Sequence, residues 1–210
     1  MWACGARVIG VSIRVMPRPA WPRSSLAAWA ALSFVASLAG QDAPVRPAAV
    51  AGQFYSADPV KLRRSVEVLM ARALPSQGGT AAVLIAPHAG LMFSGQIAAD
   101  AYRQAAAATF ETVVILGANH TTAGFTRVSV DARRDWQTPL GQVAVDRELG
   151  SALLAACRDC VVDEAVHARE HSVEVHVPFV QVLWPAAKIL PVVVGAPDRG
   201  MTTRLGEALA

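Results

Sequence analysis

Two histidines follow two short hydrophobic segments of this chain in the same way. His88 comes shortly after the apolar run at residues 83–86, and His120 comes shortly after the apolar run at residues 113–116. Neutral imidazole is the commonest protein ligand for zinc, copper and non-haem iron, and two imidazoles leave coordination positions open for substrate or water. If both side chains reach one cleft, the pair predicts a metal site.

The residues around these histidines predict how they are brought together. Both apolar runs are rich in β-branched residues and end at turn-forming residues, which is typical of buried strands. The Ala-rich residues 96–108 between them predict a helix. A strand–helix–strand unit of this size makes its two strands parallel, and parallel strands end at the same edge of a sheet, where open α/β sheets bind ligands. We therefore expect the two strands to be neighbours, with His88 and His120 facing one cleft.

The length and composition are sufficient for one α/β domain. The chain has 210 residues, of which 53% are hydrophobic. Asp58 and Asp146 are placed to cap helices at 59–70 and 147–156, while residues 188–194 predict a buried strand. Pro191 lies within that strand and indicates an edge position or a bulge. We predict an α/β fold, an open, mostly parallel sheet with helices on both faces, at residues 51–210 after a linker at 41–50.

A histidine-rich stretch at residues 167–176 has two interpretations. If it is a helix, His167 and His171 share a face and Glu174 lies one turn beyond. The pattern His167-x-x-Glu170-His171 also matches the inverzincin motif, in which two histidines hold zinc and the glutamate is the general base. That site needs a further acidic ligand well downstream, and only two acidic residues follow Glu174. Histidines bonded to nearby carboxylates at a helix edge are favoured over a zinc peptidase.

Cys157 and Cys160 form a single C-x-x-C motif, for which a zinc ribbon would need a second pair. The motif follows a helical pattern instead of opening a helix after a strand, which disfavours a thioredoxin-like redox role. We expect no metal here. Two partly buried thiols near a helix end are the favoured interpretation, with a local disulfide as the alternative if the protein is exported.

The first forty residues resemble a targeting segment. They contain four Arg and no acidic residue, with an apolar run at 26–36 that is short for a membrane span. Ser37-Leu38-Ala39 provides a small-residue cleavage site. The pattern predicts a signal peptide at residues 1–40 and an exported or periplasmic protein, or one tethered to the membrane by an uncleaved leader. The alternative is that translation starts later, so that the leader is never made and the protein is cytoplasmic.

Charge outside the leader is nearly balanced. Of the 19 Lys and Arg, four lie in the leader, so fifteen remain against all 16 Asp and Glu. No basic stripe is present, and we therefore expect no binding to nucleic acid.

Several motifs together resemble the Memo family, which includes protein B of the AmmeMemoRadiSam system. They are Ala51-Gly52-Gln53-Phe54-Tyr55 with Asp58-Pro59, Ala86-Pro87-His88-Ala89-Gly90, Gly117-Ala118-Asn119-His120, Trp136-x-Thr138-Pro139-Leu140-Gly141 and Glu170-His171-Ser172-x-Glu174. The resemblance extends over roughly residues 46 to 210. The family is related in fold to the class III extradiol dioxygenases, which use non-haem iron(II) to open catechol rings.

This resemblance implies roles for three residues. His88 and His120 would be ligands of iron or copper, and His171 would stand near the metal as a catalytic acid or base. The family's third ligand belongs to a later strand-end motif of the Ser-Ser-Asp type. We expect the domain to be incomplete at its C-terminus with respect to that motif.

The function hypothesis is a metal-dependent, dioxygenase-like redox protein. Iron(II) or copper would be held by His88 and His120, and His171 would move protons, for which a pKa near neutrality suits it. The first alternative is a non-catalytic protein that binds a metal or a partner at the same cleft. The second is the zinc peptidase built on His167, Glu170 and His171. The sequence does not specify the small-molecule substrate or protein partner.

Overall fold

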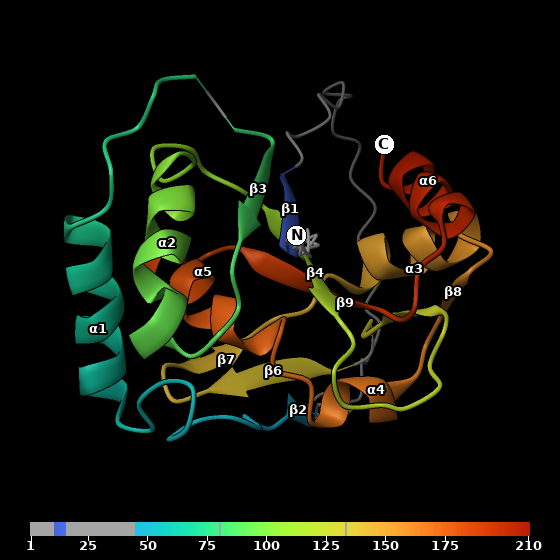
Figure 1. Ribbon diagram of the computed structural model, residues 1–210, viewed down its shortest axis with the longest axis horizontal. Coiled ribbons are helices and arrows are strands. Elements are labelled where there is room, and N and C mark those ends of the chain that lie inside the picture. Colours follow the sequence, from blue (N-terminus) through green and yellow to red (C-terminus); the bar gives the residue numbers. More distant parts are fainter. Residues whose placement is uncertain (1–10, 16–44, 80, 133) are drawn as a thin grey trace, which may run out of the picture.

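The computed structural model describes residues 11–15, 45–79, 81–132 and 134–210 (Figure 1). The strands are β1 (Val11–Val15), β2 (Val45–Arg46), β3 (Val83–Ala86), β4 (Thr112–Ala118), β5 (Val128–Val130), β6 (Asp135–Thr138), β7 (Gly141–Val143), β8 (Cys160–Val161) and β9 (Lys188–Val194). The helices are α1 (Pro59–Ala71), α2 (Leu91–Arg103), α3 (Arg147–Ala156), α4 (Glu164–Ala168), the 3-10 helix η1 (Glu174–His176), α5 (Val177–Leu183) and α6 (Arg199–Ala208).

The larger sheet has the strand order β3-β1-β4-β9-β5-β8, and a smaller sheet has the order β2-β6-β7. In the larger sheet β4 and β9 are parallel, as are β5 and β8, whereas β1 is antiparallel to both neighbours and β5 is antiparallel to β9. Helices α1, α2 and α5 lie on one side of it, with α3 and α6 on the other (Figure 1). The α/β class with an open sheet is confirmed, although the sheet is mixed.

Strands β3 and β4 are parallel to each other but are not neighbours, so that part of the prediction is wrong. Strand β1 lies between them, with Ser12 opposite Ile85 on one side and Leu116 on the other. Because β1 is antiparallel to both, β3 and β4 run in the same direction and end at one edge of the sheet. The expected common edge is therefore present, with one strand between the two.

Only part of the N-terminal region for which predictions were made is described by the structure. Most of the predicted signal peptide at 1–40 lies outside the described residues, whereas Val11–Val15 is strand β1 of the main sheet. Within the predicted linker, residues 45–46 form β2, which pairs with β6, and Arg46 is fully buried. Within the described residues, no helix combines the length and the apolar character needed to cross a bilayer.

Two helices begin where their capping residues predict. The Asp58 carboxylate accepts hydrogen bonds from the N–H groups of Val60 and Lys61 at 2.8 and 3.0 Å, and Asp146 caps α3 in the same way. These bonds satisfy N–H groups that have no partner within the helix. Helix α2 begins at Leu91, five residues before the predicted helix, and follows directly on the loop that carries His88.

Pro191 occupies a central strand, so the expected edge position or bulge is wrong. Strand β9 lies between β4 and β5, and Pro191 is opposite Ile115 of β4. The N and O atoms of one strand residue point to the same side, and the Pro191 carbonyl accepts from the N–H of Asp131 on the β5 side. Strand β5 ends at Val130, one residue before Asp131. The backbone N–H that proline lacks is therefore missing only at the end of the hydrogen-bond ladder between β5 and β9.

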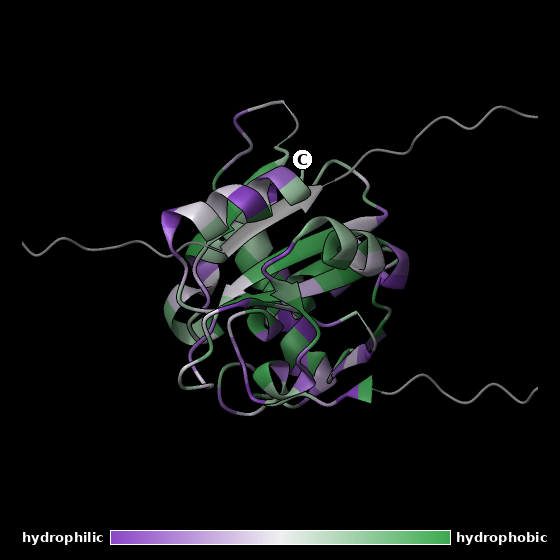
Figure 2. Ribbon diagram, turned by 90° about the vertical axis from the view of Figure 1, so that its right-hand side faces the viewer, coloured by the Kyte–Doolittle hydropathy of each residue, from purple (hydrophilic) through white to green (hydrophobic). Residues whose placement is uncertain are grey.

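The hydrophobic core lies between the main sheet and the helices. Figure 2 shows the central strands in hydrophobic colours and the helices with mixed hydrophilic and hydrophobic residues. From α1, Leu62 and Val66 are fully buried, and from α2 Tyr102 stacks on Phe179 with ring centroids 4.7 Å apart. This packing fixes α2 against α1 and α5, and so fixes the loop before α2.

A buried ion pair joins β2 to the segment between α4 and α5. The Arg46 guanidinium contacts the Glu174 carboxylate, and both side chains have no exposed surface. Arg46 also donates to the carbonyls of His167 and Glu170 at 2.9 Å and stacks on Trp136, with its Cζ atom 4.1 Å from the ring centroid. The Glu174 carboxylate in turn accepts from backbone N–H groups at residues 49 and 50. The histidine-rich segment is thereby tied to the beginning of the domain.

Replacement of Arg46 by Met should lower the free energy of unfolding by about 3–5 kcal/mol, because it leaves the buried Glu174 carboxylate without its counter-charge. Urea denaturation measures this change. The matched control is Arg147→Met, which removes a 2.9 Å pair with Asp135 whose arginine is 44% exposed. The control should cost no more than about 1 kcal/mol. Equal losses for the two variants would contradict a special role of the buried pair.

Candidate metal centre

Three histidines converge at the edge where β3 and β4 end. His88, His120 and His171 each offer a ring nitrogen, and these atoms all lie within 4.8 Å of one another. The ring centroids are 5.1 Å apart for His88 and His120, 4.6 Å for His120 and His171, and 5.9 Å for His88 and His171. The structure thus brings together the pair predicted from the strand ends and adds His171 to it.

His88 is positioned by the short loop between β3 and α2. The loop is held at Gly90, whose neighbour Leu91 donates its N–H to the carbonyl of Phe54 at 2.8 Å. A Cβ atom on Gly90 would lie 3.2 Å from that carbonyl oxygen, so a larger residue would push the two segments apart. The Phe54 ring packs against His171 with centroids 4.6 Å apart. The aromatic residue at the start of the domain therefore forms one wall of the site.

His120 is positioned by β4 and by a buried carboxylate. It follows Asn119, whose N–H donates to Val194 on β9 at 2.9 Å and thereby extends the ladder to the edge of the sheet. Its own N–H donates to Oε2 of Glu170 at 2.6 Å, and its Nδ1 lies 3.0 Å from Oε1. An ionised carboxylate can only accept, so Nδ1 carries the proton and Nε2 is the nitrogen free to bind a metal.

Glu170 is the anchor of the site. In addition to His120, its carboxylate accepts from the N–H groups of His171 and Ser172 at 2.8 and 2.9 Å. Burial alone would raise the pKa of Glu170, but the hydrogen bonds from His120 and Ser172 lower it to about 2. The carboxylate is therefore ionised at neutral pH and has no exposed side-chain surface. It is not arranged as a general base facing a substrate.

Gly117 allows the histidine segment to lie directly against β4. A Cβ atom at this position would collide with the Ser172 side chain. The Ser172 hydroxyl donates to the carbonyl of Ala118 at 2.8 Å. Because Gly117 has no side chain, the segment that carries Glu170 and His171 can pack directly against the end of β4.

The protonation states at the site suit metal binding. Burial lowers the pKa of His88 below its usual value, and the nearby imidazoles of His120 and His171 lower it further. Burial also lowers the pKa of His171. Neutral imidazole, the form that coordinates metals, is therefore favoured at neutral pH. His120 is 39% exposed, so the group opens to solvent and to ligands. Three imidazoles with one orienting carboxylate fit iron, copper or zinc.

The other two histidines lie apart from this group. His167 is fully buried, with Nε2 3.0 Å from the Ser129 hydroxyl, and burial lowers its pKa to about 4. His176 is buried against Tyr102, whose hydroxyl is 3.1 Å from its Nδ1. Residues 167–176 do not form the continuous helix considered above, since α4 ends at Ala168 and η1 begins at Glu174. The structure does not bring His167 to His171, so the zinc peptidase alternative has no structural support.

Cys157 and Cys160 form a disulfide between α3 and β8. The favoured interpretation of two free thiols is therefore wrong, and the local disulfide is present. The pair is buried, and no third ligand-type side chain joins it among the described residues. Disulfides of this kind persist in oxidising compartments.

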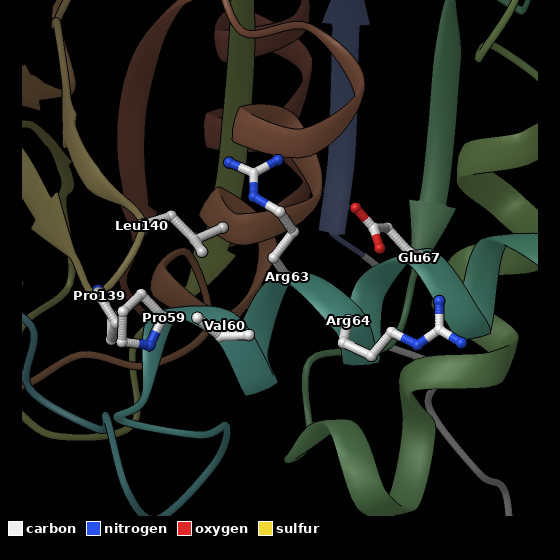
Figure 3. Close-up of a pocket in the computed structure, with 7 residues that line it drawn as sticks. All are labelled: Pro59, Val60, Arg63, Arg64, Glu67, Pro139 and Leu140. Carbon is white, nitrogen blue, oxygen red and sulfur yellow. The ribbon is translucent and has the colours of Figure 1, made fainter.

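A separate cavity of about 370 Å³ lies between the first turns of α1 and the turn from β6 to β7. Figure 3 shows Arg63, Arg64 and Glu67 of α1 around it, with Pro139 and Leu140 from the turn. Among the described residues that line it there is no histidine and a single carboxylate, that of Glu67, so they do not offer a set of metal ligands.

Sequence reasoning missed two members of the site. Glu170 was considered as a general base or as a carboxylate bonded to nearby histidines, and Phe54 only as part of a family motif. The contact of Glu170 with His120 spans fifty residues, and no short-range pattern reveals such a contact.

Comparisons with known proteins identify the family of this chain. Residues 46–210 match a family model described as Memo-like protein. A MEMO1 family protein of Methanopyrus kandleri is 40% identical over 174 residues, which cover 78% of this chain and 61% of the relative. A MEMO1 family protein of Methanothermobacter thermautotrophicus is 39% identical over 174 residues, and one of Sulfolobus acidocaldarius is 38% identical over 178 residues. Each of these two matches covers 79% of this chain and 62% of the relative.

The chain thus spans less than two thirds of the length of these relatives. The matched region contains β3, β4 and the segment with Glu170 and His171, so it includes all three histidines of the site. The resemblance seen in the motifs is confirmed: this chain belongs to the Memo-like family.

Proposed function

We propose that this protein is a metal-dependent, dioxygenase-like redox protein that uses non-haem iron(II) or copper. The observation that supports the proposal is the convergence of three imidazoles within 4.8 Å at the edge of an α/β sheet. A non-haem iron or copper ion bound there would supply one-electron chemistry and a Lewis acid. The substrate is not specified by the resemblance, and catechols, which the fold-related class III extradiol dioxygenases open, are the first compounds to test.

The three histidines would have different roles. His88 and His120 hold the ion, because they come from the two strand ends and His120 presents Nε2 once Glu170 holds its Nδ1. His171 lies on the Phe54 side and moves a proton to or from a substrate hydroxyl. Its Nδ1 is 3.4 Å from Oε1 of Glu170, so the carboxylate stabilises the imidazolium that forms when His171 takes up a proton.

Metal analysis of purified variants separates these roles. His88→Ala and His120→Ala should each remove most bound iron or copper, because one strand-end imidazole is lost. His171→Ala should keep the metal. Isothermal titration with iron(II) under argon, and with copper, measures each affinity. Loss of metal in His171→Ala would make His171 a third ligand and contradict the acid–base role.

Oxygen uptake by the iron(II)-loaded protein with a panel of catechols tests turnover in the same variants. The unmodified chain should consume dioxygen, and His171→Ala should be slower by about 10²–10⁴-fold, the usual contribution of a general acid or base. Metal binding without any substrate-dependent uptake would favour the non-catalytic metal-binding alternative.

Glu170→Gln should weaken metal binding by about 10–100-fold, the usual effect of losing the carboxylate that orients a ligating histidine. The amide keeps the size of the side chain but cannot accept from all of its present donors. Asp131→Asn is a suitable control, because Asp131 is also buried but accepts from Trp136 instead of a site histidine. An unchanged affinity in Glu170→Gln would show that this carboxylate does not orient His120.

Cys157→Ser/Cys160→Ser and His167→Asn should leave the bound metal content unchanged. The disulfide sulfurs and the buried His167 are outside the three-histidine group. Elemental analysis after dialysis provides the measurement. A loss of zinc in His167→Asn would instead revive the inverzincin interpretation.

A further inference from the structure

A buried histidine outside the metal centre lies near His88. His176 is 1% exposed, and its Nδ1 is 3.1 Å from the hydroxyl oxygen of Tyr102. Burial lowers the pKa of His176 to about 3, so its imidazole is neutral at neutral pH. The charge of His88 contributes to this lowering, which requires the two rings to be near each other in the interior. None of the roles proposed above uses His176.

The contact with Tyr102 fixes the tautomer of His176. Tyr102 is fully buried, and burial raises the pKa of its hydroxyl well above the usual value, so the hydroxyl keeps its proton. His176 provides its one hydrogen-bond partner among the described residues. The hydroxyl therefore donates to Nδ1, and the ring proton of His176 is on Nε2.

Two buried ring nitrogens have no hydrogen-bond partner among the described residues. They are Nε2 of His176 and Nδ1 of His88, and both have essentially no exposed surface. A buried polar group that is left unsatisfied costs about 1–3 kcal/mol. Buried waters in folded proteins bond to such groups, and one water can accept two hydrogen bonds. A single water between the two rings would therefore satisfy both nitrogens.

We propose that a buried water bridges Nδ1 of His88 and Nε2 of His176, and that His176 is thereby a positioning residue of the metal centre. The inference rests on the proposed function, because it assigns Nε2 of His88 to the metal. Nδ1 is the nitrogen that protein encloses, which leaves Nε2 for the ion. A histidine that binds a metal almost always donates its other ring N–H to a carboxylate, a carbonyl or a water. Glu170 accepts this bond from His120, and the bridging water accepts it from His88.

A crystal structure of the metal-free 210-residue chain tests the bridge directly. Density for one water should lie about 2.7–3.2 Å from both nitrogens. Two observations would overturn the bridge. One is the absence of such a water. The other is a water that joins His88 to the Thr121 hydroxyl instead, which is also buried and without a partner.

Two variants that differ by one methylene test the positioning role. His176→Asn keeps an amide oxygen near the position of Nδ1, where it can accept from Tyr102, but it removes Nε2. The longer side chain of His176→Gln can place an amide N–H near the position of Nε2. Isothermal titration with iron(II) under argon should show an affinity about 10–100-fold lower in His176→Asn, the usual effect of losing such a partner. His176→Gln should restore most of that loss.

His167→Asn is the matched control for these variants. His167 is as buried as His176, but its Nε2 bonds to Ser129 and it lies outside the three-histidine group. The control should bind iron(II) as the unmodified chain does. Far-UV circular dichroism and thermal unfolding show whether each variant is folded.

Nuclear magnetic resonance of the imidazole nitrogens separates positioning from a loss of packing. In the metal-free unmodified chain, long-range ¹H–¹⁵N spectra should show the proton of His88 on Nδ1. In His176→Asn the same ring should become a mixture of both tautomers. His120 is an internal reference, because Glu170 keeps the proton of that ring on Nδ1 in both proteins.

The outcomes distinguish this inference from the proposed function. If the unmodified chain binds neither iron(II) nor copper, the proposed function fails, while the crystal structure and the spectra still decide on the bridge. If the metal binds equally well to His176→Asn, His176 does not position His88 and the inference fails. It also fails if His167→Asn weakens binding equally, or if His176→Gln binds no better than His176→Asn.

Discussion

The buried guanidinium of Arg46 and the buried carboxylate of Glu174 hold the beginning of the domain against the histidine-rich segment. Each charge would be costly in this interior without the other, and each is also satisfied by backbone groups of the segment it holds. The pair therefore acts as a fixed connection between residues that are 128 positions apart. The arrangement of the metal centre follows from this connection.

Glu170 lies four residues before Glu174, and its carbonyl accepts from Arg46. The ion pair holds the histidine-rich segment in the position where the Glu170 carboxylate contacts His120. In the same position His171 lies beside His88. Gly117 then allows close contact with β4. Two buried carboxylates in one short segment thus have separate tasks. Glu174 fixes the segment to the domain, and Glu170 orients the imidazole of His120.

The sequence was sufficient for features that depend on near neighbours. The caps at Asp58 and Asp146 predicted the starts of α1 and α3, and the spacing of His88 and His120 predicted their common edge. Features that depend on contacts between residues distant in the sequence were either not predicted or predicted wrongly. No local pattern shows that residues 11–15 enter the sheet between β3 and β4, or that Arg46 is buried instead of lying in a linker. Pro191 was misplaced for a related reason, because its tolerance depends on where β5 ends.

The Glu170 carboxylate accepts four hydrogen bonds from protein groups, one of them from the His120 ring, so the orientation of this imidazole does not require a bound ion. Such a preformed site differs from that of a zinc finger, in which the free energy of metal binding is also the free energy of folding. Exchange of one ion for another should leave this fold intact. Imidazole sites bind copper more tightly than iron(II) whenever both are present. The ion bound at the proposed site would then be decided by the metal supply of the compartment in which the protein folds.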